Sequence, residues 1–262
     1  MLASDQKLPV SGGAAKRAYV RAMFTAIAPT YDRLNRILSF RLDLHWRRRA
    51  VAQLGWERVP DGIYLDLCAG TLDFAAALAR RPGFRGRVVG ADFVRPMLEL
   101  GRGKARGLEP VTADALELPF AAAAFDGAMI GWGIRNLADL DAGLTELARV
   151  LKPGARVVII DMATPHPQPL RGLYLFYFER VLPRIGRLVS GHASAYEWLP
   201  ESTRAFPAPE ELARRIAAAG FTTVGYTPLM GGITVLLVGT RQPTGPAAIP
   251  SAAPLERSPD GH

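Results

Sequence analysis

The 262-residue sequence contains a single cysteine, Cys68, and only four histidines. One cysteine can form neither an intramolecular disulfide nor an all-cysteine zinc site, so we expect a cytoplasmic protein. The histidines are scattered and show none of the short spacings that zinc ligands have. We therefore predict that the chain binds no metal.

Long apolar segments are absent as well. No run of about 18 uncharged apolar residues occurs, and the N-terminal residues lack the apolar core of a signal peptide. We therefore expect neither a membrane span nor a secretory signal. Any contact with a membrane would be peripheral.

The sequence has fewer acidic than basic residues. It contains 24 Asp and Glu and 32 Lys and Arg, which gives a net charge of +8 at pH 7. Such a surplus can attract nucleic acid or an anionic membrane surface. We favour a simpler explanation, the arginine-rich composition that high-GC genomes produce. The arginines are dispersed and no aromatic platform alternates with them, so we expect no nucleic-acid partner.

The order of the predicted elements indicates an α/β fold. Apolar residues at helical spacing predict two or three helices in residues 14–54, broken at Pro29. From Asp61 onward, β-type runs alternate with helical segments, which predicts right-handed crossovers and a parallel sheet. A helix at 209–219 and two closely spaced runs at 221–227 and 233–239 predict an antiparallel terminal hairpin. The five earlier runs are 63–67, 87–92, 110–112, 127–131 and 156–161.

Two helical segments, 14–54 and 165–211, fall outside this alternation and are expected on the substrate side. The aromatic stretch 170–189 is predicted to form a lid whose apolar residues line a channel and whose arginines meet anionic headgroups. A buried helix with a charged outer face is the alternative. We expect a catalytic domain at 14–241, with disordered ends at 1–13 and 242–262. The predicted channel residues are Leu173, Phe176, Tyr177 and Val181.

Polar and small residues follow the first three predicted strands. In an open parallel sheet the ligand lies at the carboxyl ends of the strands, near the switch point. The turn at 68–73 (CAGTLD) precedes a helix and can present main-chain N–H groups to an anion. Asp92 ends the second run, where a carboxylate binds ribose hydroxyls, and Asp114 and Ala115 could flank an adenine. A dinucleotide enzyme stays open, although the terminal hairpin is not typical of dehydrogenases.

Four segments resemble one known family over residues 19–241. The chain resembles the C-methyltransferases of ubiquinone and menaquinone biosynthesis, the UbiE/MenG family, and the motifs YDxxN and GIRN look specific for quinone methylation. The resemblance implies a Rossmann-like class I methyltransferase with a seven-stranded, mostly parallel sheet, an antiparallel terminal hairpin, a helical N-terminal extension and a lid insertion. The segments are FTAIAPTYDRLNRILSF with Trp46, AFDGAMIGWGIRN, ARVLKPGARVVIID and YEWLPESTRAFP.

The resemblance also implies the reaction, with S-adenosylmethionine as methyl donor and a prenylated quinol, demethylmenaquinol or a ubiquinol precursor, as acceptor. Arg135 would stabilise the developing phenolate. A salt bridge from Arg135 to Asp139 or Asp141, and core packing of the tyrosines, are the structural alternatives. The expected catalytic residues are Arg135, Asn136, Asp73, Tyr31 and Tyr196. The expected cofactor-binding residues are Asp66, Gly70, Thr71, Asp92, Asp114, Ala115 and Gly131.

The chain departs from the family pattern at several positions. Ala69 and Leu72 stand in the loop that the family writes with three glycines, so they could hinder close approach of the cofactor. Asp43 replaces a histidine, Gly131 a serine and Asp161 a glutamate. A methyltransferase for a phenol, sterol or amine, an RNA-modifying protein and a silent cofactor-binding scaffold are the alternative functions. Peripheral contact with the cytoplasmic face of an anionic inner membrane and a homodimer are further expectations.

Overall fold

The computed structural model describes residues 8–165, 170–181 and 193–243. Residues 1–7 and 244–262, which make up most of the two ends expected to be disordered, lie outside this part of the chain. The first described helix, α1, begins at Gly13, and the last strand, β7, ends at Arg241. The described elements therefore span almost the same residues as the predicted catalytic domain.

Seven strands form one sheet in the order β3-β2-β1-β4-β5-β7-β6. Neighbours among β1 to β5 pair in parallel, whereas β7 runs antiparallel to both β5 and β6. This confirms the predicted mostly parallel sheet with a terminal hairpin, and β1 and β2 have the predicted bounds. The strands are β1 (Ile63–Leu67), β2 (Arg87–Asp92), β3 (Leu108–Thr112), β4 (Phe125–Gly131), β5 (Leu151–Met162), β6 (Phe221–Leu229) and β7 (Thr234–Arg241).

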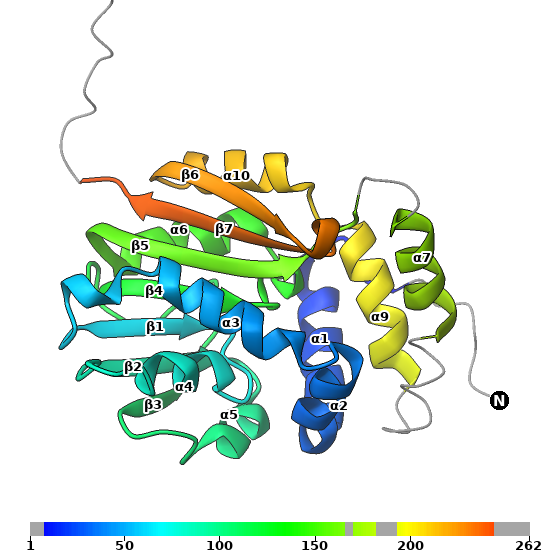
Figure 1. Ribbon diagram of the computed structural model, residues 1–262, viewed down its shortest axis with the longest axis horizontal. Helices are drawn as coiled ribbons and strands as arrows, with labels where there is room; N and C mark the ends of the chain where they lie inside the picture. The colour runs from blue at the N-terminus through cyan, green and yellow to red at the C-terminus, as the bar shows by residue number, and fades with distance from the viewer. Residues whose placement is uncertain (1–7, 166–169, 182–192, 244–262) are drawn as a thin grey trace, which may run out of the picture.

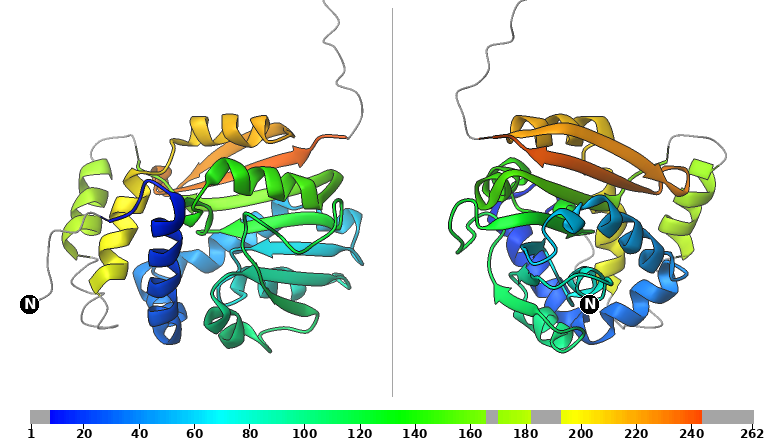
Figure 2. Two further views of the ribbon diagram at one scale, coloured as in Figure 1. Left: turned by 180° about the vertical axis from the view of Figure 1, so that it is seen from behind. Right: turned by 60° about the vertical axis from the view of Figure 1, so that its left-hand side comes forward.

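Helices cover both faces of the sheet, as Figures 1 and 2 show. One face carries α3 (Leu42–Gln53), α4 (Asp73–Ala79) and α5 (Arg95–Gly101), and the other carries α6 (Leu140–Val150) and α10 (Pro209–Ala218). α6 begins at Leu140 because Oδ1 of Asp139 accepts the Ala142 N–H over 3.0 Å and caps the helix. The residues before the cap form a separate 3-10 turn, η3 (Ile134–Asn136).

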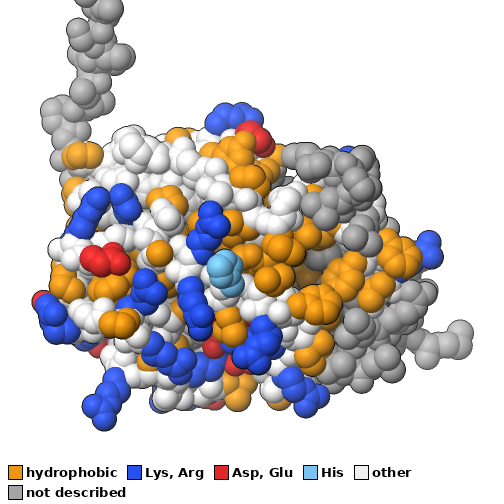
Figure 3. Space-filling view, viewed as in Figure 1, with side chains coloured by type: hydrophobic (Ala, Val, Ile, Leu, Met, Phe, Trp, Pro, Cys, Tyr) orange, Lys and Arg blue, Asp and Glu red, His pale blue; other side chains and the backbone are white. Residues whose placement is uncertain are grey.

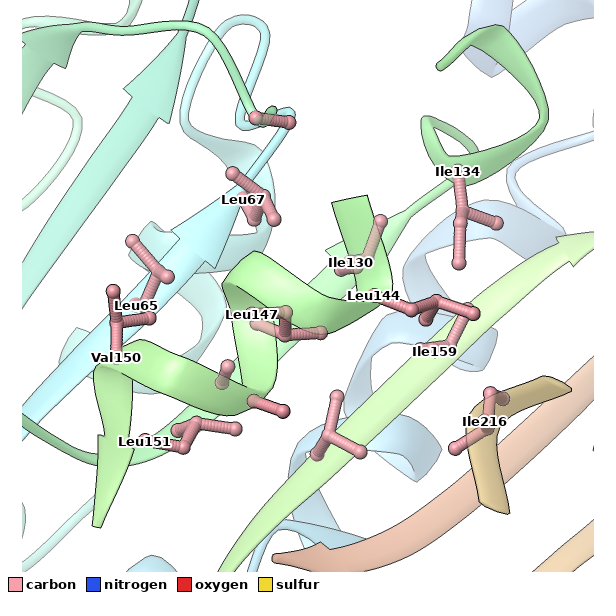
Figure 4. Close-up of a cluster of buried hydrophobic side chains, with 14 of the residues drawn as sticks. Leu65, Leu67, Ile130, Ile134, Leu144, Leu147, Val150, Leu151, Ile159 and Ile216 are labelled. Carbon is pink, nitrogen blue, oxygen red and sulfur yellow. The ribbon is translucent and has the colours of Figure 1, made fainter. Parts of the chain in front are cut away.

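Successive side chains of each strand enter opposite cores, because the side-chain period of a strand is two. Leu65 and Leu67 of β1 pack beneath α6 and α10 in the core drawn in Figure 4, whereas Tyr64 packs beneath α3 and α4. Full burial of such a side chain stabilises the fold by about 1.5–3 kcal/mol. The strand ends are thus held on both faces, which gives the site a rigid base.

The carboxyl ends of the parallel strands are covered by helices from the two predicted substrate-side segments (Figure 1). α1 (Gly13–Ile27) leads through a 3-10 turn, η1 (Ala28–Thr30), into α2 (Tyr31–Leu38), so the predicted break at Pro29 is confirmed. The later segment supplies α7 (Leu170–Phe176), a π-helical turn, η4 (Tyr177–Val181), and α9 (Ala193–Arg204). Among the described residues, no helix is long and apolar enough to cross a membrane.

Candidate active site

A pocket of about 700 Å³, here called the cofactor pocket, opens at the carboxyl ends of β1, β2 and β4. β1 is the switch point of the sheet, because β2 follows on one side of it and β4 on the other. Five of the seven residues predicted to bind the cofactor line this pocket. They are Gly70, Asp92, Asp114, Ala115 and Gly131.

Asp92, at the end of β2, has the environment of a ribose-binding carboxylate. Its Oδ2 accepts the Gly70 N–H and its Oδ1 accepts the Val94 N–H, both over 2.8 Å. Burial raises the pKa of Asp92 to about 6, against the opposing effect of these backbone donors, so the group is ionised at neutral pH. Each oxygen keeps a lone pair for another donor. Asp92 can therefore accept hydrogen bonds from two ribose hydroxyls.

Leu72 leaves the cofactor pocket open, although it replaces a residue that allows close approach. Its φ of 61° lies in the region that favours glycine. The side chain is fully buried and does not line the pocket. It fills the space above Gly90, where a Cβ would lie 2.1 Å from Cδ2 of Leu72. Ala69 packs in the same core, so both departures from the family loop face away from the ligand space.

The other two predicted cofactor residues, Asp66 and Thr71, lie behind the pocket wall and do not line it. Oδ2 of Asp66 accepts the N–H of Ala75 in the first turn of α4 over 2.8 Å. Burial raises the pKa of Asp66 to about 7. Thr71 donates its hydroxyl to Asp32 of α2. These contacts fix the loop between β1 and α4 on the side that does not line the pocket.

Asp114 faces α1 across the cofactor pocket. Its Oδ1 accepts the Leu116 N–H over 3.0 Å, and the carboxylate forms an ion pair with Arg17 of α1. Both charged side chains line the pocket. An adenine amino group bound at Asp114 would share the carboxylate with Arg17, a residue that sequence analysis did not single out.

A second pocket of about 1400 Å³, here called the acceptor pocket, adjoins the first and is lined mainly by apolar side chains of α1, α2, α3 and α9. Its charged lining residues are Asp43, Arg47 and Arg135. Three aromatic residues line both pockets and therefore stand between the two ligand spaces. They are Phe24, Tyr31 and Trp132.

Arg135 is, with Arg47, one of two buried arginines that line the acceptor pocket. Its Nη1 donates to Oδ1 of Asp161 and to the Trp132 carbonyl, both over 2.6 Å. Its Nε is buried and has no hydrogen-bond partner among the residues that the structure describes. A guanidinium stays charged, and an unsatisfied N–H in an apolar space favours an oxygen that carries negative charge. The site thus holds a fixed cation beside two joined pockets, and one of its buried N–H groups is unpaired among the described residues.

Comparison with known proteins identifies the family. The model of the ubiE/COQ5 methyltransferase family matches residues 13–241. The chain belongs to the ubiE/COQ5 methyltransferase family. The resemblance predicted from four sequence segments is thereby confirmed.

Relatives in this family cover most of the chain. A demethylmenaquinone methyltransferase of Thermus thermophilus is 51% identical over 224 residues, which are 84% of this chain and 100% of that protein. A demethylmenaquinone methyltransferase of Deinococcus radiodurans is 42% identical over 246 residues, 92% and 100% of the two chains. The ubiquinone/menaquinone biosynthesis C-methyltransferase UbiE of Geobacter sp. M21 is 41% identical over 228 residues, 85% and 96% of the two chains.

Solved structures share the fold at low sequence identity. A SAM-dependent methyltransferase of Thermotoga maritima has a TM-score of 0.59 at 20% identity and covers 84% of this chain and 99% of its own. The [4+2]-cyclase SpnF has a TM-score of 0.64 at 14% identity and covers 90% and 99%. The expected Rossmann-like methyltransferase fold is confirmed. Because a cyclase shares it, the reaction has to be argued from the site.

Two predicted catalytic residues of this ubiE/COQ5 member, Tyr31 and Asn136, line the cofactor pocket, and Tyr31 also lines the acceptor pocket. Burial raises the pKa of the Tyr31 phenol, although a hydrogen bond with Asn35 opposes the rise, so Tyr31 stays protonated at neutral pH. Asn136 lines the cofactor pocket, and its Oδ1 accepts the indole N–H of Trp198 over 2.9 Å. Tyr31 can therefore donate to an acceptor oxygen, while Asn136 connects the cofactor pocket to α9.

Of the other two predicted catalytic residues, Asp73 lies away from both pockets, and the role of Tyr196 stays a prediction. Asp73 lines neither pocket, and its carboxylate binds Arg36 over 2.6 Å and Lys104 over 2.7 Å. Although burial opposes the shift, Arg47 and Lys104 lower the pKa of Asp73. This cluster ties α2 and α3 to the cofactor loop. The side chain of Tyr196, in α9, lies outside the described residues.

Trp132 is a site residue that sequence analysis missed. Its φ is 55°, and its N–H donates to the Ile160 carbonyl over 2.7 Å. The guanidinium of Arg47 lies 4.7 Å from the centre of the Trp132 ring and is paired with Asp43, the residue that replaces a family histidine. A left-handed backbone is uncommon in a non-glycine residue, and such residues are enriched at functional sites. The only sequence signal was the tryptophan between two glycines after β4.

One of the four residues that were predicted to line the channel is confirmed as a pocket-lining residue. Tyr177 lines the acceptor pocket as predicted, and Tyr174, which was not predicted, also lines it. The prediction for Phe176 is wrong, because Phe176 does not line the pocket and its side chain points to solvent, 59% exposed. Val181 does not line the pocket, and the side chain of Leu173 lies outside the described residues. The helix therefore turns a different face to the pocket than its apolar pattern suggested.

Proposed function

We propose that the chain transfers a methyl group from S-adenosylmethionine to a ring carbon of a demethylated prenylquinol. Demethylmenaquinol is the acceptor that the names of its relatives favour. One observation carries the proposal: Arg135, a buried arginine whose Nε–H has no partner among the described residues, lines a largely apolar acceptor pocket that shares a wall with the cofactor pocket.

The cofactor pocket fits S-adenosylmethionine, which supplies, when bound, a methyl group on a positively charged sulfur. Asp92 would hold the ribose, and Asp114 and Ala115 would flank the adenine. The loop at Gly70 brings main chain to the pocket with no Cβ, so the ligand can approach it closely. The described residues thus provide hydrogen-bonding groups for the ribose and the adenine of the cofactor.

On the acceptor side, Arg135 does the electrostatic work. A neutral quinol is a poor carbon nucleophile, so the site must favour its phenolate. The guanidinium, held by Asp161, stabilises that negative charge in a space with few polar groups, where the effect is stronger than in water. Tyr31 and Trp132 confine the ring between the pockets and exclude water, so the reacting carbon is aligned by the walls.

The quinones of a host that lacks this gene test the proposal. We expect the unmethylated prenylquinone to accumulate, and we expect the wild-type gene, but not Arg135→Ala, to restore the methylated form. An unchanged quinone profile would reject the proposed acceptor. Transfer to a phenol, sterol or amine by the purified protein, without transfer to a demethylated quinol, would favour the nearest alternative function.

Location and assembly are part of this proposal. An acceptor with a prenyl tail resides in a bilayer, so we propose a cytoplasmic enzyme that works at the membrane surface. The largely apolar acceptor pocket gives no support to an RNA substrate, and filter binding to RNA tests that point. The expected homodimer is tested by analytical ultracentrifugation.

A further inference from the structure

The mouth of the acceptor pocket is rimmed by exposed apolar side chains. Phe40, at the turn between α2 and α3, is 75% exposed, and Met230, in the turn η5 (Met230–Gly232) between β6 and β7, is 52% exposed. Both line the pocket and both have left-handed backbone, with φ of 51° and 50°. Two turns that are far apart in the sequence thus present large apolar groups at one opening.

Two further exposed residues extend this rim outside the pocket. Ile37 of α2 is 46% exposed and Phe176 of α7 is 59% exposed. The residues that follow them are in contact, because the hydroxyl of Tyr177, the first residue of η4, donates to the Leu38 carbonyl at the end of α2 over 3.1 Å. Figure 3 shows hydrophobic side chains gathered around a hollow on this face. We call Ile37, Phe40, Phe176 and Met230 the rim.

The rim is a concentration and not a random scatter. Seven large hydrophobic side chains are exposed among the described residues, and four of them belong to the rim. Two of the rim residues, Phe40 and Met230, line the acceptor pocket, whereas none of the other three exposed residues, Val59, Leu100 and Tyr226, does so. Single exposed apolar residues are normal, whereas a cluster around an opening marks an interaction site.

The exposed charges of the segment that carries Ile37 and Phe40 are of one sign. The segment 33–49 runs from α2 through the turn at Phe40 into α3, and its exposed charged side chains are arginines. Its one carboxylate, Asp43, is buried and paired with Arg36 and Arg47. An apolar tip flanked by guanidinium groups matches the boundary between acyl chains and anionic headgroups. The exposed arginines are Arg33, Arg41, Arg48 and Arg49.

We propose that the rim inserts into the surface of an anionic lipid bilayer, so that the prenylated acceptor passes from the bilayer into the pocket without crossing water. This inference rests on the proposed function, because it takes the acceptor to be a membrane lipid. The rim residues bury their apolar groups among acyl chains, and the arginines pair with lipid phosphates. The tail of the acceptor then remains in the bilayer while its ring reaches Arg135.

Vesicle binding tests the docking surface with a matched control. The test variant is Ile37→Ser/Phe176→Ser, whose residues do not line the pocket, and the control is Val59→Ser/Leu100→Ser, with similar exposure of 42% and 51%. We expect wild type and control to sediment with phosphatidylglycerol vesicles at low salt and to be released at high salt. The test variant should bind about tenfold to a hundredfold more weakly. Equal binding by all three proteins would overturn the proposal.

Activity with two acceptors separates docking from chemistry. We expect the test variant to methylate a short-tailed quinol in solution at the wild-type rate, and to lose about tenfold or more with a long-tailed quinol embedded in vesicles. Failure of wild type on the soluble quinol would reject the proposed function, while the sedimentation result would still test the bilayer contact. Equal losses on both acceptors would overturn a docking role.

Two further measurements keep the test decisive if the double variant folds poorly. Arg33→Gln/Arg41→Gln should lower the salt concentration at which half of the protein leaves anionic vesicles, because fewer charges face the lipid. Analytical ultracentrifugation tests the other possible partner of the rim, a second copy of the chain, by measuring whether the protein is a dimer. A rim variant that abolishes a dimer, with no vesicle binding by wild type, would assign the rim to a protein interface instead.

Discussion

The guanidinium of Arg135 donates to Oδ1 of Asp161 over 2.6 Å, and both side chains are buried, with exposures of 7% and 0%. Oδ2 of Asp161 also accepts the main-chain N–H of Arg135 over 3.2 Å. One carboxylate therefore holds the arginine at its side chain and at its backbone. Since the pair joins the end of β5 to η3, the sheet sets the direction of the guanidinium in the acceptor pocket.

Asp161→Asn tests this relationship. Loss of the carboxylate releases the guanidinium, so we expect kcat to fall at least tenfold and the pH at which kcat is half-maximal to rise, because the phenolate is less well stabilised. Asp161→Glu, the residue found in the family, should keep more activity than Asp161→Asn. Removing one partner of a buried pair also costs about 3–5 kcal/mol, so chemical denaturation must show that the variant is folded in the assay. An unchanged pH profile would leave Asp161 with a purely structural role.

The affinity for the cofactor should fall in acid because of Asp92. Burial raises the pKa of this carboxyl to about 6, and only the ionised form is a full acceptor for two ribose hydroxyls. We expect the Kd of S-adenosylhomocysteine, measured by calorimetry between pH 5 and pH 8, to rise as the pH drops below about 6. Asp92→Asn should bind weakly and show a flatter pH dependence. A wild-type Kd that is constant over this range would contradict the role given to Asp92.

Asp66 should make the fold less stable as the pH rises. Burial raises its folded-state pKa from 3.8 to about 7, so the folded protein holds the proton more tightly than the unfolded chain. The resulting stability is fully present below about pH 4 and is lost as the pH rises through 7, up to a limit of about 4 kcal/mol. In the variant Asp66→Asn, the side chain at this position does not ionise, so this pH-dependent loss of stability is absent. Urea unfolding at pH 5 and pH 8 should therefore give a smaller decline for the variant, and parallel declines would refute the assignment.

Leu72 and Gly90 should be energetically coupled. Leu72→Ala removes a buried side chain at a cost of about 2–5 kcal/mol, and Gly90→Ala forces a Cβ against Leu72 at a cost of about 1–3 kcal/mol. The double variant has room for the new methyl group, so its loss in unfolding free energy should be smaller than the sum. Gly225→Ala is the control, because no atom lies within 4 Å of its Cβ position. Strict additivity would mean that Leu72 does not fill this space.

The regular part of the fold could be predicted because its signals are local. β1 and β2 have the predicted bounds, and the break at Pro29 follows from the residue itself. The partner of Arg135 could not be predicted, because spacing suggested Asp139 or Asp141, whereas Asp139 caps α6 and Asp141 pairs with Arg215. The contact with Asp161 depends on how β5 lies beside β4, which no local pattern encodes.

The residues of the two pockets also differ in whether local sequence signals could predict them. Residues at strand ends, such as Asp92 and Asp114, could be predicted because parallel strands bring their carboxyl ends to one edge. Arg17 and Trp132 could not, since Arg17 reaches the pocket only after α1 folds over the strand ends and Trp132 only through its left-handed backbone. The helices outside the α/β alternation supply most of the acceptor pocket, so its lining depended on tertiary packing.

Arg135→Ala, assayed with a soluble short-tailed demethylmenaquinol, tests the central claim most directly. We expect kcat to fall by about two to three orders of magnitude, as when a charge-stabilising donor is removed, while the Kd of S-adenosylhomocysteine changes less than about threefold. Equal losses in turnover and cofactor affinity, or methyl transfer at the wild-type rate, would contradict the assignment of Arg135 to the acceptor.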